Sequence, residues 1–159
     1  MSPAISQTKV AGVQTGLSAG VYKARLGSSS SRILAGPDYP TRVFGKARVA
    51  VYFPGEGSRA IIITTWDKRY KTSKGIGPCS TIAQMKKAYG GAVKGSWAGT
   101  QGDVVHSYVV GNNLLFATQD HRTISAVALY RGTPGHTRGG SPQAFANYVA
   151  VSETSCVSG

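Results

Sequence analysis

The feature that most restricts the fold is a helix signal that occurs twice, 63 positions apart. In its second occurrence, Thr81-x-x-Gln84 has the form of a capping box, in which each side chain satisfies a backbone N–H that the first helical turn leaves free. Apolar residues then recur at helical spacing, at Ile82, Met85 and Tyr89. The spacing predicts an amphipathic helix over 81–89, which ends with Gly90 in the left-handed conformation.

The first occurrence lies 63 positions earlier, without gaps. Internal repeats are sought first because a missed repeat misassigns the whole fold. At this offset the paired residues are Gly75 with Gly12, Ile76 with Val13, Thr81 with Ser18, Met85 with Tyr22, Tyr89 with Leu26 and Ile124 with Ile61. Further along, Phe116 pairs with Phe53 and Arg122 with Arg59. The offset predicts a first helix at about 17–26 and a duplication that includes the strands.

Strand signals follow the first helix signal. Residues 28–41 contain many turn formers and are expected as a loop that carries a short strand at Ile33 and Leu34. Alternating β-branched and aromatic residues then predict strands at 42–44, 48–53 and 59–66. Gly45-Lys46 is expected to turn the chain between the first two of these strands.

The second half repeats this order. A loop that runs through Trp97 to Gly102 is expected after the helix. Three strands should follow, at 104–110, 114–118 and 122–130. Residues 144–151 are expected to pack as a last short strand or helix.

The predicted fold is therefore α+β, with two tandem helix-plus-antiparallel-meander repeats that form one continuous or fused sheet. The expected organisation is a flexible N-terminal tail at 1–11, a first repeat at 12–74, a second repeat at 75–132, and a C-terminal extension at 133–159 that a disulfide ties back.

Composition restricts the class of protein. The 159 residues are 41% hydrophobic, enough for a real core in one domain or in two small halves that share an interface. The longest apolar stretches, 60–63 and 114–117, have strand length and fall far below the roughly 18 residues of a membrane helix. No membrane span is therefore expected. Lys and Arg number 18 against 6 Asp and Glu, a net charge of +12, which predicts attraction to anionic partners.

Two cysteines, Cys79 and Cys156, lie 77 positions apart. We expect them to form a disulfide, which would imply an oxidising compartment; the alternative is two unpaired thiols. A bridge that closes a loop of this size would constrain the unfolded chain by on the order of 4 kcal/mol in the entropy model.

No catalytic motif rises above background, so no catalytic residue is assigned and the chain is not expected to be an enzyme. Gly75-x-Gly77 before a helix has the form of a phosphate cradle, but the third glycine and the Rossmann-type context are missing. A Cys79 thiolate with His106 or His121 as its base is a further candidate, yet nothing in the sequence places either histidine near it. The histidines and acids lack metal-ligand spacing, so neither a metal nor a cofactor is expected.

Aromatic and basic residues interleave along the predicted strands. This combination can build a surface on which rings stack and cations contact phosphates, as in proteins that bind single-stranded nucleic acid or polysaccharide. The candidate binding residues are Arg48, Tyr52, Trp66, Arg69, Trp97, Tyr108 and Arg122. The alternative is a set of core aromatics beside a solvated basic rim, because the aromatics are dispersed and no RNA-binding motif is present.

Two stretches carry a resemblance to a known family. GLSAGVYKARLG at 16–27 and GPCSTIAQMKKAYG at 77–90 resemble the G-[ML]-[ST]-x-x-x-V-x-x-x-L-G helix start of secreted tandem-repeat proteins of the β-lactamase-inhibitory-protein type. The same helix start occurs in the related outer-membrane-assembly lipoproteins of the SmpA/OmlA kind. Residues 72–90 are more similar still to uncharacterised exported actinobacterial proteins that carry T-x-x-G-I/V-x-V/P-G-S-T-x-A-Q-V-K-K-A-Y-G. The similarity covers about residues 12–130.

The resemblance implies a secreted or extracytoplasmic, non-catalytic binding or scaffold protein that uses a concave sheet or its loops to hold a macromolecule. It assigns no inhibitory function, because the inhibitor's contact loops cannot be matched residue by residue. With a net charge of +12, the expected partner is an acidic protein or an anionic cell-envelope polymer, and nucleic acid is an alternative. A cell-envelope hydrolase with loop-borne catalytic residues is the rival function. The oligomeric state is left open.

Overall fold

The computed structural model describes most of the chain between residues 5 and 130. The described ranges are 5–6, 8–27, 30–33, 40–53, 59–60, 62–90, 93–98, 104–111, 113–118 and 122–130. For 30–33, 40–41, 93–98 and 104–107 the backbone alone is described. Leu34, the element expected at 144–151 and the C-terminal extension at 133–159 lie outside these ranges.

Two helices form where the repeated signal predicted them. They are α1, Ala19–Leu26, and α2, Ile82–Ala88. The capping box of α2 is confirmed, because the side chains of Thr81 and Gln84 each accept a hydrogen bond from the other's backbone N–H. The left-handed Gly90 was predicted wrongly. The chain instead leaves α2 through the C-cap Tyr89, with φ −127° and ψ 75°, so no left-handed residue is needed there.

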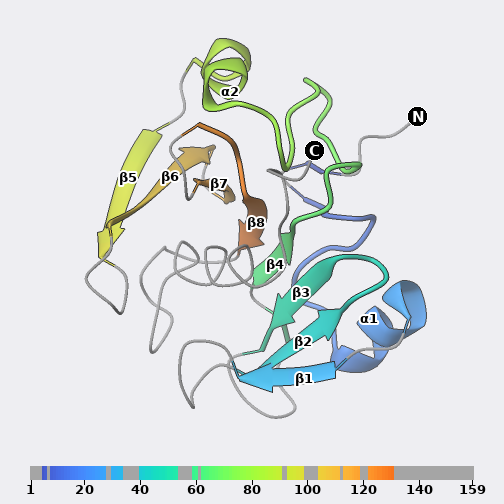
Figure 1. Cartoon of the computed structure of the whole chain (residues 1–159). Helices are drawn as coiled ribbons and strands as arrows, with labels where there is room; N and C mark the ends of the chain where they lie inside the picture. The colour runs from blue at the N-terminus through green and yellow to red at the C-terminus, as the bar shows by residue number, and fades with distance from the viewer. Residues whose placement is uncertain are drawn as a thin grey trace.

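Eight strands of the described residues form one sheet in which neighbouring strands are antiparallel (Figure 1). They are β1 (Ser30–Ile33), β2 (Pro40–Phe44), β3 (Val49–Tyr52), β4 (Ile62–Thr65), β5 (Val93–Ala98), β6 (Val104–Val110), β7 (Leu114–Thr118) and β8 (Ala126–Tyr130). Their order in space is β1-β2-β3-β4-β8-β7-β6-β5, so the two halves of the chain meet where β4 pairs with β8. The α+β class and the single antiparallel sheet agree with the prediction.

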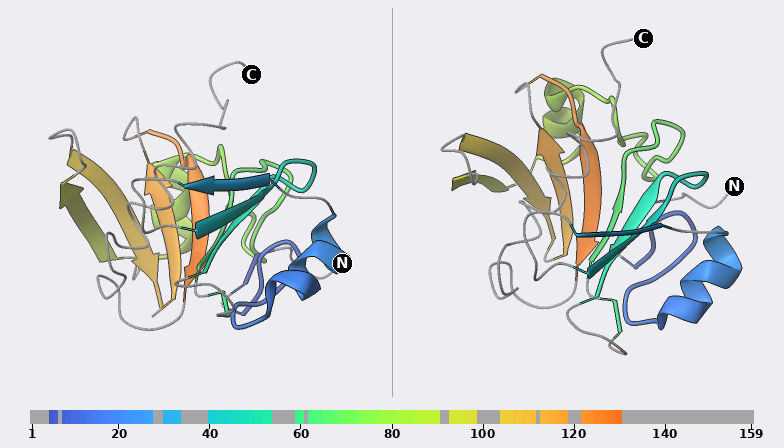
Figure 2. Two further views of the ribbon diagram at one scale, coloured as in Figure 1. Left: turned by 90° about the horizontal axis from the view of Figure 1, so that it is seen from below. Right: turned by 60° about the horizontal axis from the view of Figure 1, so that its bottom comes forward.

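The centre of the sheet is buried on both faces. In β3, Val51 packs in a cluster that includes Tyr22 of α1 and Met85 of α2, here called the helix-side cluster, whereas Ala50 and Tyr52 belong to another cluster, called the second-face cluster. Successive side chains of a strand point to opposite faces, so the two clusters lie on opposite sides of the sheet. All residues of β3, β4, β7 and β8 are buried. A solvated face would show alternating exposure, so these strands present no open concave surface. The sheet twists between β1 and β5 (Figure 2).

The largest difference from the prediction lies at β5, where Val93–Ala98 forms a strand and a loop was expected. Gly95 weakens the local strand signal. The register with β6, from Val93↔Val109 to Ala98↔Val104, nevertheless pairs all six residues. β1 likewise occupies a segment that was expected mainly as loop. Both are outer strands of this sheet, and pairing with a neighbour outweighs local propensity there.

β4 and β8 begin later than predicted, because the residues before them bond to the start of a helix. The Gly16 N–H donates to the Ala60 carbonyl at 2.8 Å, and the Cys79 N–H donates to the Ile124 carbonyl at 2.7 Å. Ala60 and Ile124 each return a hydrogen bond to the residue after their partner. The two halves therefore anchor their helix starts to the sheet in the same way.

Backbone conformation also recurs at the predicted offset. Gly12 and Gly75 have φ values of 79° and 78°, and Gly16 and Cys79 have φ values of 84° and 71°. The gap-free offset does not extend into the strands, however. By their hydrogen bonds to the helix starts, Ile124 corresponds to Ala60, which lies 64 positions earlier. The sequence offset of 63 positions had paired Ile124 with Ile61.

Part of the expected N-terminal tail is packed. Ile5 and Val10 are fully buried in the helix-side cluster. The Ile5 N–H donates to the Lys71 carbonyl at 3.2 Å, which ties this segment to the chain between β4 and α2. The packing of this segment could not be predicted from the sequence, because Ile5 lies among small polar residues and a single apolar side chain produces no hydrophobic periodicity.

Candidate anion-binding pocket

The turn between β2 and β3 ends in a residue with an unusual backbone. Arg48 has a φ of 54°, in the left-handed region that side-chain-bearing residues rarely occupy. Its carbonyl oxygen accepts a hydrogen bond from Thr65 Oγ1 at 2.8 Å and another from the Trp66 N–H at 3.3 Å. These two bonds join the start of β3 to the end of β4 and hold Arg48 in this conformation.

The chain that leaves β4 forms a compact ion pair. Asp67 is only 1% exposed, and its carboxylate accepts two hydrogen bonds from Arg69 Nε, both at 3.1 Å, and one from Arg69 Nη2 at 2.7 Å. The Arg69 backbone N–H donates a further bond to Asp67 Oδ1 at 2.9 Å. The Arg69 side chain is 71% exposed. The pair therefore has a buried anion and a cation that faces water.

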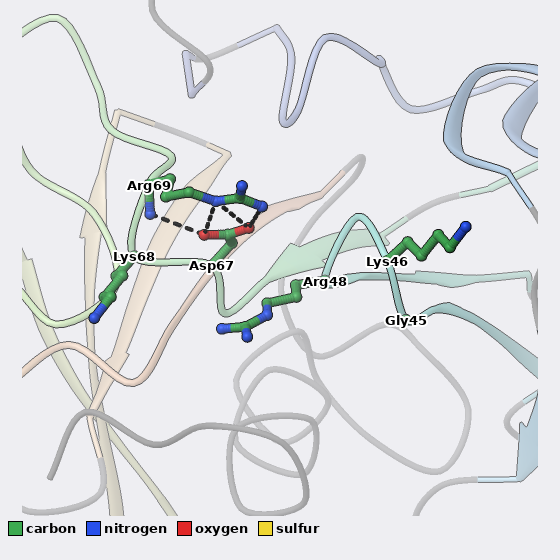
Figure 3. A pocket seen from close by; sticks show the side chains of 6 residues that line it. All are labelled: Gly45, Lys46, Arg48, Asp67, Lys68 and Arg69. Atoms are coloured by element: carbon green, nitrogen blue, oxygen red, sulfur yellow. Dashed lines mark hydrogen bonds and ion pairs between the residues drawn. The ribbon is translucent and has the colours of Figure 1, made fainter. Parts of the chain in front are cut away.

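These two segments line an open pocket of about 480 Å³ (Figure 3). Its lining residues are Gly45, Lys46, Arg48, Asp67, Lys68 and Arg69, of which all but Asp67 are exposed. Figure 3 shows Arg69 against Asp67 and the Arg48 guanidinium extending beneath the same carboxylate. The Lys46 side chain extends in the opposite direction. The positive charges of the pocket therefore point in different directions and do not surround one point.

The pocket carries more positive than negative charge. Four cations and one carboxylate line it, and Arg69 already neutralises that carboxylate. Among the described residues, the side chains of Lys46, Arg48 and Lys68 have no hydrogen-bond or ion-pair partner. These three exposed positive charges are therefore the ones in the described pocket that can bind an anion from outside.

The electrostatics keep Asp67 ionised. Burial raises the pKa of this carboxyl, but hydrogen bonds from Arg69 and the charges of Arg69 and Arg48 lower it, and the net pKa lies below the ordinary 3.8. The hydrogen bond to Asp67, and then its charge, raise the pKa of Arg69. At neutral pH the carboxylate is thus ionised and hydrogen-bonded to Arg69. It therefore positions Arg69 and cannot act as a general acid.

The structure brings two of the seven candidate binding residues, Arg48 and Arg69, into this pocket. Tyr52 and Trp66 are 2% and 5% exposed in the second-face cluster, and Tyr108 is 7% exposed in the helix-side cluster. A ligand ring cannot stack on side chains buried in this way. These three aromatics correspond to the alternative interpretation, in which core aromatics lie beside a solvated basic rim.

The other two candidates lie elsewhere. Arg122 is exposed, and its carbonyl oxygen accepts a hydrogen bond from the Ile82 N–H at 2.8 Å. It therefore lies next to the first residue of α2. Trp97 lies on β5, which β8, β7 and β6 separate from β4, and its side chain lies outside the described residues. Neither residue lines the pocket.

Neither Lys46 nor Lys68 is among the seven candidate binding residues drawn from the sequence. The sequence shows each of them as a basic residue in or next to an expected turn or strand end. Their meeting depends on the register of β3 with β4, where Val49 pairs with Thr65. A prediction of this pairing would have placed the turn at 45–48 beside the segment that follows Thr65.

A second, smaller pocket of about 210 Å³ lies between the N-terminal segment and α2. Its cation, Lys74, donates to the Ala88 carbonyl at 3.0 Å and lies 4.9 Å from the centroid of the Tyr89 ring. Because that charge is already engaged, this pocket is the weaker candidate for anion binding.

Comparisons with protein-family models, with curated proteins and with solved structures find no match. The family resemblance drawn from 16–27 and 77–90 therefore stays a prediction. Neither α1 nor α2, the helices of the described ranges, is long and apolar enough to cross a membrane. No group of three or more potential metal ligands occurs within the part of the chain that the structure describes.

Proposed function

We propose that this chain is a non-catalytic binding or scaffold protein that holds an anionic macromolecule through the pocket at Lys46, Arg48 and Lys68. The observation that carries the proposal is a set of three exposed cations, with no hydrogen-bond or ion-pair partner in the part of the chain that the structure describes, around a carboxylate that Arg69 already neutralises. Several cations that line one pocket attract an anion more strongly than single cations distributed over the whole molecule.

The chemistry of the pocket favours binding over catalysis. General acid–base work needs a group that exchanges a proton near neutral pH. The acid that lines this pocket, Asp67, has a lowered pKa and is bonded to Arg69, and its other lining residues are glycine, lysine and arginine. A hydrolase would have to place its catalytic groups elsewhere on the chain.

We also propose that the chain consists of two tandem helix-plus-meander repeats. The matching φ values of Gly12 with Gly75 and of Gly16 with Cys79 support this, because they recur at one offset and because Cys79, which carries a side chain, rarely adopts the left-handed conformation of its counterpart Gly16. The shared hydrogen bonds from helix start to strand add support. A one-residue insertion in the second repeat accounts for the step from 63 to 64 positions.

An exported location remains part of the proposal and depends on the cysteines. Among the described residues there is no free cysteine. The partner that we expect for Cys79, Cys156, lies outside the described residues. A bridge between them would suit an oxidising compartment.

The function can be tested with two triple variants of equal net charge. One replaces Lys46, Arg48 and Lys68 with glutamine, and the control replaces the exposed helix residues Lys23, Arg25 and Lys87 with glutamine. Retention on an immobilised polyanion is measured at two salt concentrations. We expect the pocket variant to lose retention and the control to keep most of it. Equal losses would mean that net charge alone drives binding, and the proposal would then be abandoned.

A further inference from the structure

We propose that the pocket binds the phosphate groups of a polyanionic chain, independently of any base, and that Arg48 is its main contact. This inference rests on the proposed function and specifies the chemistry of the ligand.

The first step is the backbone of Arg48. A hairpin turn that closes on a left-handed residue normally places glycine there, because a Cβ is disfavoured at positive φ. This chain has arginine at that position, with φ 54°, and two hydrogen bonds to its carbonyl hold the conformation. Strained residues of this kind persist where the surrounding structure holds them, and they cluster at ligand sites. The side chain of this strained residue lines the pocket.

The second step is the arrangement of charge. Arg48 extends beneath Asp67, whereas Lys46 extends in the opposite direction (Figure 3). Cations that diverge do not converge on one small ion. They match charges that are spaced along a chain, and the open pocket of about 480 Å³ leaves room for such a chain to pass.

The third step separates phosphate from an acidic protein. Protein interfaces draw most of their affinity from buried aromatic or apolar anchors near the centre. The exposed lining here is glycine, lysine and arginine, and the neighbouring Trp66 is only 5% exposed. Guanidinium and ammonium groups bind phosphate oxygens without such anchors, and arginine does so through two parallel hydrogen bonds. The buried Trp66 likewise offers no ring for base stacking.

The test uses Arg48→Gly, because glycine removes the cation and relieves the positive φ together. The controls are Ala11→Gly, at the left-handed Ala11 with φ 53°, and Lys87→Gln, which removes one exposed charge from α2. The probes are inorganic polyphosphate, oligo-dT and poly-L-glutamate with similar numbers of charges. Affinities are measured by calorimetry across a salt series, beside thermal unfolding of each variant.

We expect Arg48→Gly to unfold no earlier than the wild type and to bind polyphosphate about tenfold more weakly at low salt. Its log–log salt slope should fall by about one unit, as for the loss of one phosphate contact. Both controls should bind as the wild type does. Arg48→Lys should bind polyphosphate more tightly than Arg48→Gly and less tightly than the wild type, because lysine has the positive charge but cannot donate two parallel hydrogen bonds as arginine does.

The outcomes separate the two proposals. Unchanged polyphosphate binding by Arg48→Gly would overturn the role of Arg48. If poly-L-glutamate binds as tightly as polyphosphate, the proposed anion-binding function is supported, but the inference that the pocket selects phosphate is wrong. If oligo-dT binds much more tightly than polyphosphate, the ligand is read through its bases and the inference is wrong. If the protein binds none of the three probes, the proposed function fails as well.

Discussion

Thr81 and Gln84 cap each other at the start of α2, with the Gln84 N–H donating to Thr81 Oγ1 at 3.0 Å and the Thr81 N–H donating to Gln84 Oε1 at 2.9 Å. The corresponding N-cap of α1, Ser18, makes no side-chain capping bond. Thr81→Ala should therefore lower the free energy of unfolding by about 1 kcal/mol, and Ser18→Ala by much less. Urea denaturation of the two variants measures the difference. Equal losses would show that the capping bond contributes nothing.

Gly77 should tolerate no side chain. An added Cβ would overlap the Tyr70 carbonyl oxygen and come within 3.3 Å of the Lys71 Cα. Because both atoms belong to the backbone, no side-chain rotation relieves the overlap, and we expect Gly77→Ala to cost about 1–3 kcal/mol. The matched control is Gly90→Ala, whose Cβ meets nothing within 4 Å. A melting temperature that is the same for both variants would contradict the close approach.

Two buried tyrosines should respond oppositely to loss of their hydroxyl. The Tyr22 hydroxyl donates to the Gln14 carbonyl at 2.6 Å and accepts from the Leu17 N–H at 3.4 Å. The buried hydroxyl of Tyr130 has no hydrogen-bond partner among the described residues. Tyr22→Phe should cost about 1–2 kcal/mol, whereas Tyr130→Phe should be neutral or stabilising, because it removes an unsatisfied polar group. A large loss in Tyr130→Phe would show that a partner exists outside the described residues.

Asp67 should make stability fall in acid. Its folded-state pKa lies below the ordinary 3.8 because Arg69 and Arg48 outweigh the effect of burial. A carboxyl with a depressed folded pKa contributes stability above its unfolded pKa and loses it as the pH falls through the folded pKa. Asp67→Asn should thus be less stable than the wild type at pH 7, and the gap should narrow below about pH 4. Unfolding curves at several pH values test this, and a gap that stays constant would be evidence against the ion pair.

The cysteine pair should form a disulfide. Thiol counting on denatured, unreduced protein should find no reactive sulfhydryl, and prior reduction should expose two, Cys79 and Cys156. Two reactive thiols before reduction would refute the bridge. If the bridge is present, reduction should make the chain beyond about residue 140 sensitive to protease before the sheet unfolds, because the bond would anchor that segment.

Local sequence was sufficient for the helices and for much of the sheet. α2 could be predicted because Thr81 and Gln84 lie within one turn and its buried side chains recur at helical spacing. β3 could be predicted because β-branched and aromatic residues alternate over 48–53, and β7 because 114–117 is an apolar stretch of strand length. These signals act between residues a few positions apart, so a single sequence contains them. β5 was missed because its strand depends on a neighbour, β6, that local propensity does not include.

The candidate site depends on contacts that are distant in sequence. Arg48 and Asp67 meet because Val49 pairs with Thr65, and the two bonds to the Arg48 carbonyl then set its left-handed backbone. Burial of Tyr52 and Trp66 likewise depends on how both faces of the sheet are filled. By itself the sequence determined the two helices, most of the antiparallel strands and the excess of positive charge, because these follow from local spacing and composition. Only the tertiary structure decided which cations share a pocket and which aromatics are buried, because strand register and packing join residues that no local pattern links.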